Sequence, residues 1–186
     1  MMKLIRSRSR SGALVAGLAA AVGFTVAVLA IGPTAAAADK QTFLGQHGVW
    51  YAYRINDDGA RTCYMVSKPS RTRGKFKKRG DVVAFVTHRP REGERDVINF
   101  QAGFTYKASS TVAVRIGDKS FSLFTSKDTA WSRSASDDKA MVAAMIKGNT
   151  MDVTGAPSRG GQIVDTYSLT GFGAAYKKIT GACGLK

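Results

Sequence analysis

Histidine, cysteine and proline are scarce in this sequence, and acidic residues are far fewer than basic ones. Its 186 residues include two histidines, two cysteines and four prolines, and 13 acidic residues stand against 28 lysines and arginines. Neither His47 nor His88 lies at a metal-ligand spacing from a cysteine, an acid or the other histidine. We therefore predict no metal site and no cofactor, and we expect both histidines to be structural or merely exposed.

Catalytic signatures are missing as well. After residue 38 there is no Gly-x-Ser-x-Gly turn, no phosphate-binding Gly-x-x-x-x-Gly-Lys loop and no Gly-x-Gly-x-x-Gly fingerprint. The adjacent acids Asp137 and Asp138 stand at the expected start of a helix, where carboxylates complement backbone donors and the helix dipole. The prediction is a protein that is not an enzyme, because no residues support hydrolysis.

The first 38 residues have the order of a secretory signal peptide. Four basic residues and no acid precede an apolar run over 12–31, and Ala36 and Ala38 fit the small-residue rule for cleavage. We predict cleavage after Ala38, which leaves 39–186 as the exported domain, in the periplasm or at the outer cell surface. An uncleaved membrane anchor is the alternative, since about 20 apolar residues span a bilayer. The many alanines and glycines of the run argue against it, because they insert poorly.

The net charge is strongly positive with or without the signal peptide. Removing the four basic residues of 1–38 lowers the formal net charge from +15 to +11. A field of that sign favours acidic partners. For an exported protein these are lipopolysaccharide, anionic phospholipid met by peripheral membrane contact, and acidic glycans. Export argues against nucleic acid as a partner.

The two cysteines, Cys63 and Cys183, both follow the predicted cleavage site. An even number of cysteines in an exported chain predicts one disulfide. The alternatives are two free thiols or a metal-binding pair, and no histidine stands near either cysteine to complete a metal site.

Short runs that alternate apolar and polar residues, or that are largely apolar as at 81–87, recur through 39–186 and are separated by turn residues. They predict about eight strands, at 42–55, 61–67, 81–87, 97–101, 111–116, 120–124, 150–154 and 162–169. Helical spacing appears in 136–148 and again through Phe172, Tyr176 and Ile179. The pattern predicts an all-β fold, an antiparallel β-sandwich with one or two short helices, and a closed barrel is its nearest competitor.

A basic segment over 70–80 is the one stretch that favours recognition of a ligand. It has too little apolar surface to join a core, so we expect an exposed loop. Clustered cations bind phosphate or sulfate groups, and the candidates for binding an anionic ligand are Arg71, Arg73, Lys75, Lys77, Lys78 and Arg79. The competing interpretation is a solvated connection that protects a sheet edge.

Scattered motifs add a resemblance to a known family. Trp50 is followed by Cys63-Tyr64, Pro69, Gly80, Gly103-Phe104, Asp128 and Ala130-Trp131. The C-terminal part contains Ser158-Arg159-Gly160, Asp165-Thr166-Tyr167-Ser168-Leu169, Gly171-Phe172 and Cys183. In this combination the sequence resembles the invasion-associated locus B family over nearly all of 39–186.

The resemblance implies an exported bacterial envelope protein with an immunoglobulin-like β-sandwich, associated with invasion of host cells and with no biochemical activity attached. Many members have another cysteine soon after the early tryptophan. That cysteine is missing here, so Cys63 and Cys183 form the only possible intramolecular pair. The resemblance also implies structural roles for Arg159, Asp165 and Tyr167, with Arg159 and Asp165 as a buried ion pair before the last strand.

Two functions follow from these observations. The first is a non-enzymatic module that binds an acidic component of the envelope or of a host surface through the basic segment. The second is a structural or assembly factor of the envelope that contacts another envelope protein along a sheet edge.

Overall fold

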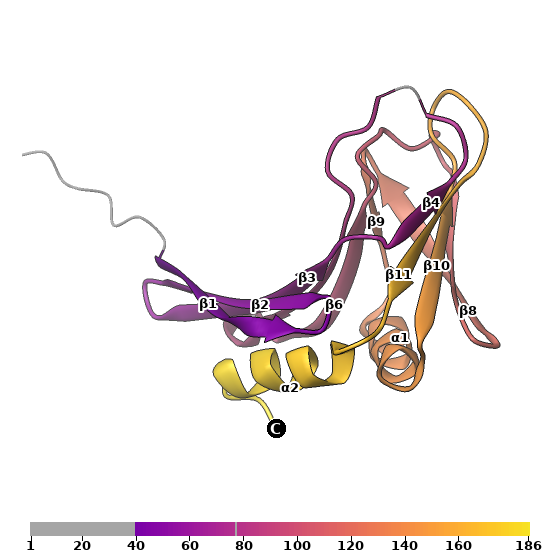
Figure 1. The fold of residues 1–186 in the computed structure, drawn as a ribbon. Helices are drawn as coiled ribbons and strands as arrows, with labels where there is room; N and C mark the ends of the chain where they lie inside the picture. The colour runs from indigo at the N-terminus through magenta and orange to yellow at the C-terminus, as the bar shows by residue number, and fades with distance from the viewer. Residues whose placement is uncertain (1–39, 77) are drawn as a thin grey trace, which may run out of the picture. The chain divides into compact units, whose positions relative to one another are not determined.

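Antiparallel strands are the predominant secondary structure of the computed structural model, which describes residues 40–76 and 78–186 (Figure 1). The predicted signal peptide and cleavage site lie outside these residues, as does Lys77. The strands are β1 (Lys40–His47), β2 (Trp50–Asp57), β3 (Ala60–Ser67), β4 (Arg71–Arg73), β5 (Val83–Arg89), β6 (Glu94–Gln101), β7 (Thr111–Ile116), β8 (Lys119–Ser126), β9 (Thr129–Trp131), β10 (Thr150–Gly155) and β11 (Ile163–Ser168). The helices are α1 (Ala135–Lys147) and α2 (Phe172–Ala182).

All described strands belong to one hydrogen-bonded sheet, in the order β1-β2-β3-β5-β6-β9-β8-β7-β10-β11-β4. Every pair of neighbours is antiparallel. The predicted mostly β, sandwich-like class with two helices is confirmed. The two layers are joined, however, because β6 pairs with β9 over Asn99–Gln101 and Thr129–Trp131. We call β1, β2, β3, β5 and β6 the first part of the sheet and the remaining strands the second part.

Alternation along the strands of the first part separates a covered face from an open one. On β2, Trp50 and Ala52 are fully buried, whereas Tyr51 between them is exposed. Helix α2 lies under the covered face (Figure 1), and the ring of Phe172 meets Trp50 edge to face at 5.0 Å between centroids. We call the opposite, uncovered face of β1, β2, β3 and β5 the outer face.

Helix α1 begins where Ser134 caps it and covers the junction of the two parts. The Ser134 hydroxyl oxygen accepts a hydrogen bond from the backbone N–H of Asp137, and Met141 and Met145 are buried on the inner side of the helix. The Asp138 carboxylate accepts a hydrogen bond of 3.0 Å from the backbone N–H of Ile98. That donor belongs to β6, just beyond the residues paired with β9. Helix α1 therefore supplies an acceptor for a backbone N–H that has no partner in β9.

Three elements differ from the sequence prediction. The expected single strand over 42–55 is two strands, because the chain turns at Gly48, whose φ of +57° suits glycine. Strands β4 and β9 were not predicted. Each has only three residues, too few to show an alternating pattern.

A disulfide between Cys63 and Cys183 ties the C-terminal end of α2 to the middle of β3. The Cα atoms are 5.9 Å apart and the two cysteines are separated by 120 residues in the sequence. Both side chains are buried. The disulfide predicted from the even cysteine number is therefore present, and it fixes α2 against the covered face of the first part.

Reduction of this disulfide should lower the free energy of unfolding. A closed loop of 120 residues restricts the unfolded chain, and the chain-entropy model gives about 5 kcal/mol as an upper figure. We expect the urea midpoint to fall sharply in reductant. The Cys63→Ala/Cys183→Ala variant should have the same urea midpoint as the reduced protein, and reductant should not change the midpoint of this variant. Equal midpoints for the oxidised and reduced protein would contradict this role.

Candidate ligand-binding surface

The basic segment is an edge strand followed by a loop. Arg71 and Arg73 belong to β4, which pairs with β11 through Thr166 and Val164 at the end of the sheet. Their side chains are exposed, and so are those of Lys75 and Lys78 in the loop that follows. The predicted exposed loop is thus partly a strand, because backbone pairing at an edge does not require apolar side chains.

Arg79 does not belong to this exposed set. Its Nη1 and Nη2 donate to the Asp165 carboxylate at 2.8 and 2.5 Å, and its Nε donates to the Ala102 carbonyl at 2.6 Å. Only 14% of the Arg79 side chain and 7% of the Asp165 side chain are exposed. The guanidinium also lies over the Phe104 ring, 4.9 Å from its centroid. Arg79 is therefore a structural residue that holds the loop to β11 and to the end of β6.

The expected ion pair between Arg159 and Asp165 is wrong. Asp165 is buried but pairs with Arg79, and the Thr72 hydroxyl donates a further hydrogen bond of 2.7 Å to it. Arg159 is exposed in the connection between β10 and β11. Tyr167, the third residue given a structural role, is buried in the core beside Phe100, and this burial raises the pKa of its hydroxyl.

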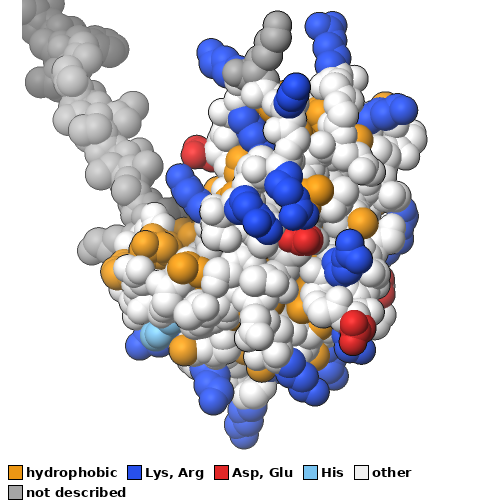
Figure 2. Space-filling view, turned by 45° about the vertical axis from the view of Figure 1, so that its right-hand side comes forward, with side chains coloured by type: hydrophobic (Ala, Val, Ile, Leu, Met, Phe, Trp, Pro, Cys, Tyr) orange, Lys and Arg blue, Asp and Glu red, His pale blue; other side chains and the backbone are white. Residues whose placement is uncertain are grey.

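Arg159 instead joins the exposed cations. A hollow of about 830 Å³ is lined by Gly74, Lys75, Phe76, Lys78, Arg159 and Gly160. Phe76 is partly exposed there and packs against Phe104 at 5.2 Å between ring centroids. Lys and Arg side chains gather over the upper part of the face in Figure 2, with few acids among them. We name Arg71, Arg73, Lys75, Lys78 and Arg159 the basic surface.

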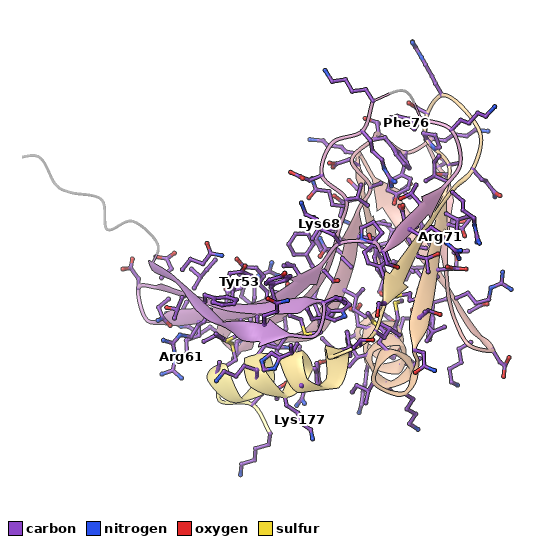
Figure 3. The ribbon with its side chains drawn as sticks, viewed as in Figure 1. Tyr53, Arg61, Lys68, Arg71, Phe76 and Lys177 are labelled. Atoms are coloured by element: carbon purple, nitrogen blue, oxygen red, sulfur yellow. A yellow bond between two sulfur atoms is a disulfide. The ribbon has the colours of Figure 1, made fainter. Side chains whose placement is uncertain are left out.

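A second hollow, of about 680 Å³, lies on the outer face. Aromatic rings from β2, β3 and β5 line it, and Lys68 stands at the end of β3 among the lining residues. Figure 3 shows Tyr53 on this face, with Lys68, Arg71 and Phe76 on the same side of the molecule, whereas Lys177 points away beyond α2. We call this hollow the aromatic groove. The sequence predicted strands in this region but did not indicate that one face of them is left without a helix.

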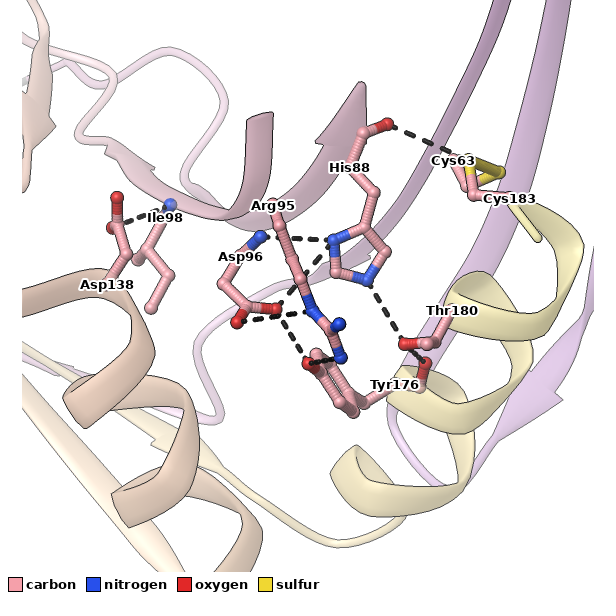
Figure 4. Close-up of polar contacts among 9 residues, drawn as sticks. All are labelled: Cys63, His88, Arg95, Asp96, Ile98, Asp138, Tyr176, Thr180 and Cys183. Atoms are coloured by element: carbon pink, nitrogen blue, oxygen red, sulfur yellow. Dashed lines mark hydrogen bonds and ion pairs between the residues drawn. A yellow bond between two sulfur atoms is a disulfide. The ribbon is translucent and has the colours of Figure 1, made fainter. Parts of the chain in front are cut away.

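A polar cluster in the interior links β5, β6 and α2 beside the disulfide (Figure 4). His88 is fully buried, and its Nδ1 accepts a hydrogen bond of 3.1 Å from the Asp96 backbone N–H. The Tyr176 hydroxyl donates to the Asp96 carboxylate at 2.7 Å. Figure 4 also shows Arg95 beside Asp96, where its Nε is 3.8 Å from the carboxylate.

These contacts fix the protonation state of His88. The Thr180 hydroxyl donates its proton to the Tyr176 carbonyl at 2.8 Å, so its oxygen must accept from the His88 Nε2–H at 3.2 Å. His88 is therefore neutral, with the proton on Nε2. Burial lowers its pKa, and the charge of Asp96 opposes this shift without cancelling it. With both ring nitrogens bonded inside the protein, His88 holds α2 to β5 and β6 and has no contact with solvent.

Two further findings concern the described residues, 40–76 and 78–186. Neither helix among them is long and apolar enough to cross a membrane. No three of their histidine, cysteine, aspartate and glutamate side chains are grouped as metal ligands would be.

Comparison with known proteins gives a family and a similar fold. Residues 50–180 match the family model described as Invasion associated locus B (IalB) protein. The crystal structure of invasion associated protein B from Bartonella henselae is similar, with a TM-score of 0.55 over 76% of this chain and 96% of that chain. The two sequences are 17% identical, so the likeness shows the fold alone. No protein with a curated description matches the chain.

The pair of Arg79 and Asp165 should contribute strongly to stability. Asp165→Asn keeps the side-chain size but leaves the buried guanidinium without its counter-charge, which costs about 3 kcal/mol. Arg71→Gln, at an exposed position on the neighbouring strand, should change stability by less than about 0.5 kcal/mol. Urea unfolding of the two variants measures the difference. Equal stability would show that the pair does not hold the loop.

Acid should destabilise the folded protein through His88. The pKa of His88 is lowered in the folded state, so below the unfolded value of about 6.5 the unfolded chain binds a proton that the folded chain does not. The free energy of unfolding should therefore be highest above about pH 6.5. Below that pH it should fall as the pH drops, by at most about 1.4 kcal/mol per pH unit.

Comparison of wild type with His88→Gln isolates this contribution. The variant should be less stable at pH 7.5, and its stability should depend less on pH between 7.5 and 5. Urea unfolding at several pH values measures both slopes. The same slope in the two proteins would show that His88 is not the group responsible.

Proposed function

The chain belongs to the invasion associated locus B family, and from that premise we propose that it is an exported, non-enzymatic binding module of the bacterial envelope. Its ligand is an acidic component of the envelope or of a host surface. The basic surface carries this proposal, because its cations are exposed on the edge strand β4, on the loop after it, which Arg79 bonds to Asp165, and on the connection between β10 and β11. Clustered cations attract anionic groups and hydrogen-bond to them.

Few acids neutralise the basic surface. Among the described residues, Asp152 lies 3.6 Å from Arg73, and both side chains are substantially exposed. Asp165, the nearest buried acid, is already paired with Arg79. Exposed ion pairs are weak and exchange readily with solvent and ions. The cations are therefore available to an incoming anion at little cost.

Other features support export and a role without catalysis. A disulfide is typical of proteins in oxidising compartments, and the net charge, which falls from +15 to +11 on removal of residues 1–38, favours anionic partners. The one buried histidine has both ring nitrogens engaged inside the protein. It therefore does not present a base to a substrate.

A sheet edge supports a second candidate, the assembly factor. Strand β1 has eight residues and, among the described strands, pairs only with β2. Phe43 on this strand is 56% exposed. A strand with a free edge can pair with a strand of another envelope protein. The bulge between Phe43 and Gly45 interrupts the regular edge and weakens this candidate.

Binding to anionic probes at low and high salt tests the first proposal. The purified protein should bind at least one of lipopolysaccharide, phosphatidylglycerol vesicles and a sulfated glycan, and binding should weaken steeply as salt is raised. A variant with Gln at Arg71, Arg73, Lys75, Lys78 and Arg159 should lose about 60-fold in affinity, if each cation contributes about 0.5 kcal/mol. Arg79 stays unchanged because it is structural.

A matched control removes the same charge elsewhere. The second variant carries Gln at five exposed lysines of other elements: Lys119, Lys139, Lys147, Lys177 and Lys178. This control variant should keep most of the wild-type affinity for the anionic probe. Equal losses in the two variants would mean that net charge, and not the basic surface, attracts the ligand. Binding to a protein partner that is unaffected by salt would favour pairing along β1 instead.

A further inference from the structure

The outer face carries a row of aromatic rings that crosses three strands. Phe43 stands opposite Tyr53 in the β1–β2 pair, and Tyr53 stands opposite Tyr64 in the β2–β3 pair. The ring centroids are 5.4 Å and 5.3 Å apart, and the two tyrosine rings are stacked. Such cross-strand pairs hold each other in place. The row is therefore a rigid surface and not a set of independent side chains.

The aromatic groove lies along this row and has the size of a small-ligand site. Its volume of about 680 Å³ is lined by rings of Tyr51, Tyr53, Tyr64 and Phe85 and by the aliphatic side chains of Val49, Val66 and Val83. Sites for small ligands measure about 300–1,000 Å³ and are mostly apolar with a few polar groups. Tyr51 and Val49 remain well exposed, so the groove is open to a ligand from solvent.

Polar groups in the aromatic groove favour a ligand that carries hydrogen-bonding groups around its edge. The amides of Gln41 and Gln46 lie in it, and Gln41 donates to the Tyr64 hydroxyl at 2.5 Å. An acyl chain would cover these amides and hydroxyls without giving them hydrogen-bond partners, which is unfavourable. A sugar ring has apolar C–H faces that stack on aromatic rings and hydroxyl groups that bond to amides. The lining therefore matches a sugar better than a lipid chain.

The positive charge of Lys68 in the groove favours an acidic sugar over a neutral one. No acidic residue lines it, and Lys68 is its one charged lining residue. The only described acid near Lys68 is Asp81 at 3.6 Å, and both side chains are more than 70% exposed, so a ligand can displace this contact. Arg71 of the basic surface follows Lys68 by three residues and lies on the same side of the molecule (Figure 3).

We infer that the aromatic groove binds the sugar rings of an acidic oligosaccharide, while Lys68 and the basic surface hold its anionic groups. This inference rests on the proposed function and names the class of its ligand. Tyr51, Tyr53 and Tyr64 stack on the rings, and Gln41 and Gln46 bond to the hydroxyls. Charge draws the ligand to the protein, and the groove distinguishes a glycan from other anions.

Calorimetric titration with three probes tests the inference. The probes are a sulfated uronate-containing tetrasaccharide, a neutral tetrasaccharide of the same length, and phosphatidylglycerol vesicles. The sulfated sugar should bind best. Tyr51→Ala should weaken binding of both sugars by about three- to tenfold. Phe124→Ala should leave it unchanged, because Phe124 is equally exposed at 38% but lies on β8, outside the groove.

The variants separate this inference from the proposed function. If the basic-surface variant loses the sulfated sugar while Tyr51→Ala binds it normally, the basic surface is the site and the groove inference is wrong. If no anionic probe binds, the proposed function fails. Vesicle binding that exceeds sugar binding and is lost in Tyr51→Ala would overturn the inference in favour of lipid. A concentration-dependent dimer, seen by sedimentation and lost in the same variant, would overturn it in favour of a second copy.

Discussion

A single sheet has two faces, and the described part of the chain supplies two α-helices, α1 and α2, to cover them. Both helices lie on the covered side: α2 under β1, β2, β3 and β5, and α1 against β6 and β8. Burial of Trp50 and Phe172 depends on that arrangement. The outer face of the first part is consequently left to solvent with its aromatic residues in place. The aromatic groove and its open access both follow from this constraint.

Two long-range connections keep the exposed surfaces in position. The disulfide fixes the end of α2 to β3 and so keeps the covered face closed. The bidentate pair of Arg79 and Asp165 fixes the loop after β4 to β11, and the Arg79 bond to Ala102 extends this to the end of β6. Loops held in this way present their cations without a large loss of conformational entropy on binding. In the proposed binding role, Arg79 positions its exposed neighbours and does not itself contact the ligand.

Local pattern predicted most strands, the helix after Ser134 and the disulfide, because alternation, capping residues and cysteine number are properties of short segments or of simple counts. Partners that are distant in the sequence could not be predicted in the same way. Arg159 is six residues from Asp165 and Arg79 is 86 residues away, yet the sheet order brings Arg79 to it. The aromatic groove was missed for a related reason. Alternation on β2 separates Trp50 from Tyr51 but does not show which side a helix will cover.

An acidic ligand is proposed to bind across the aromatic groove and the basic surface. Backbone amide NMR shifts, recorded while a sulfated tetrasaccharide is added to the isotope-labelled protein, test this proposal most directly. We expect the shifts in β1, β2 and β3, at Lys68, in β4 and its loop, and around Arg159, with the signals of α1 and α2 unchanged. Shifts confined to the helices, or spread evenly over all exposed lysines, would contradict it.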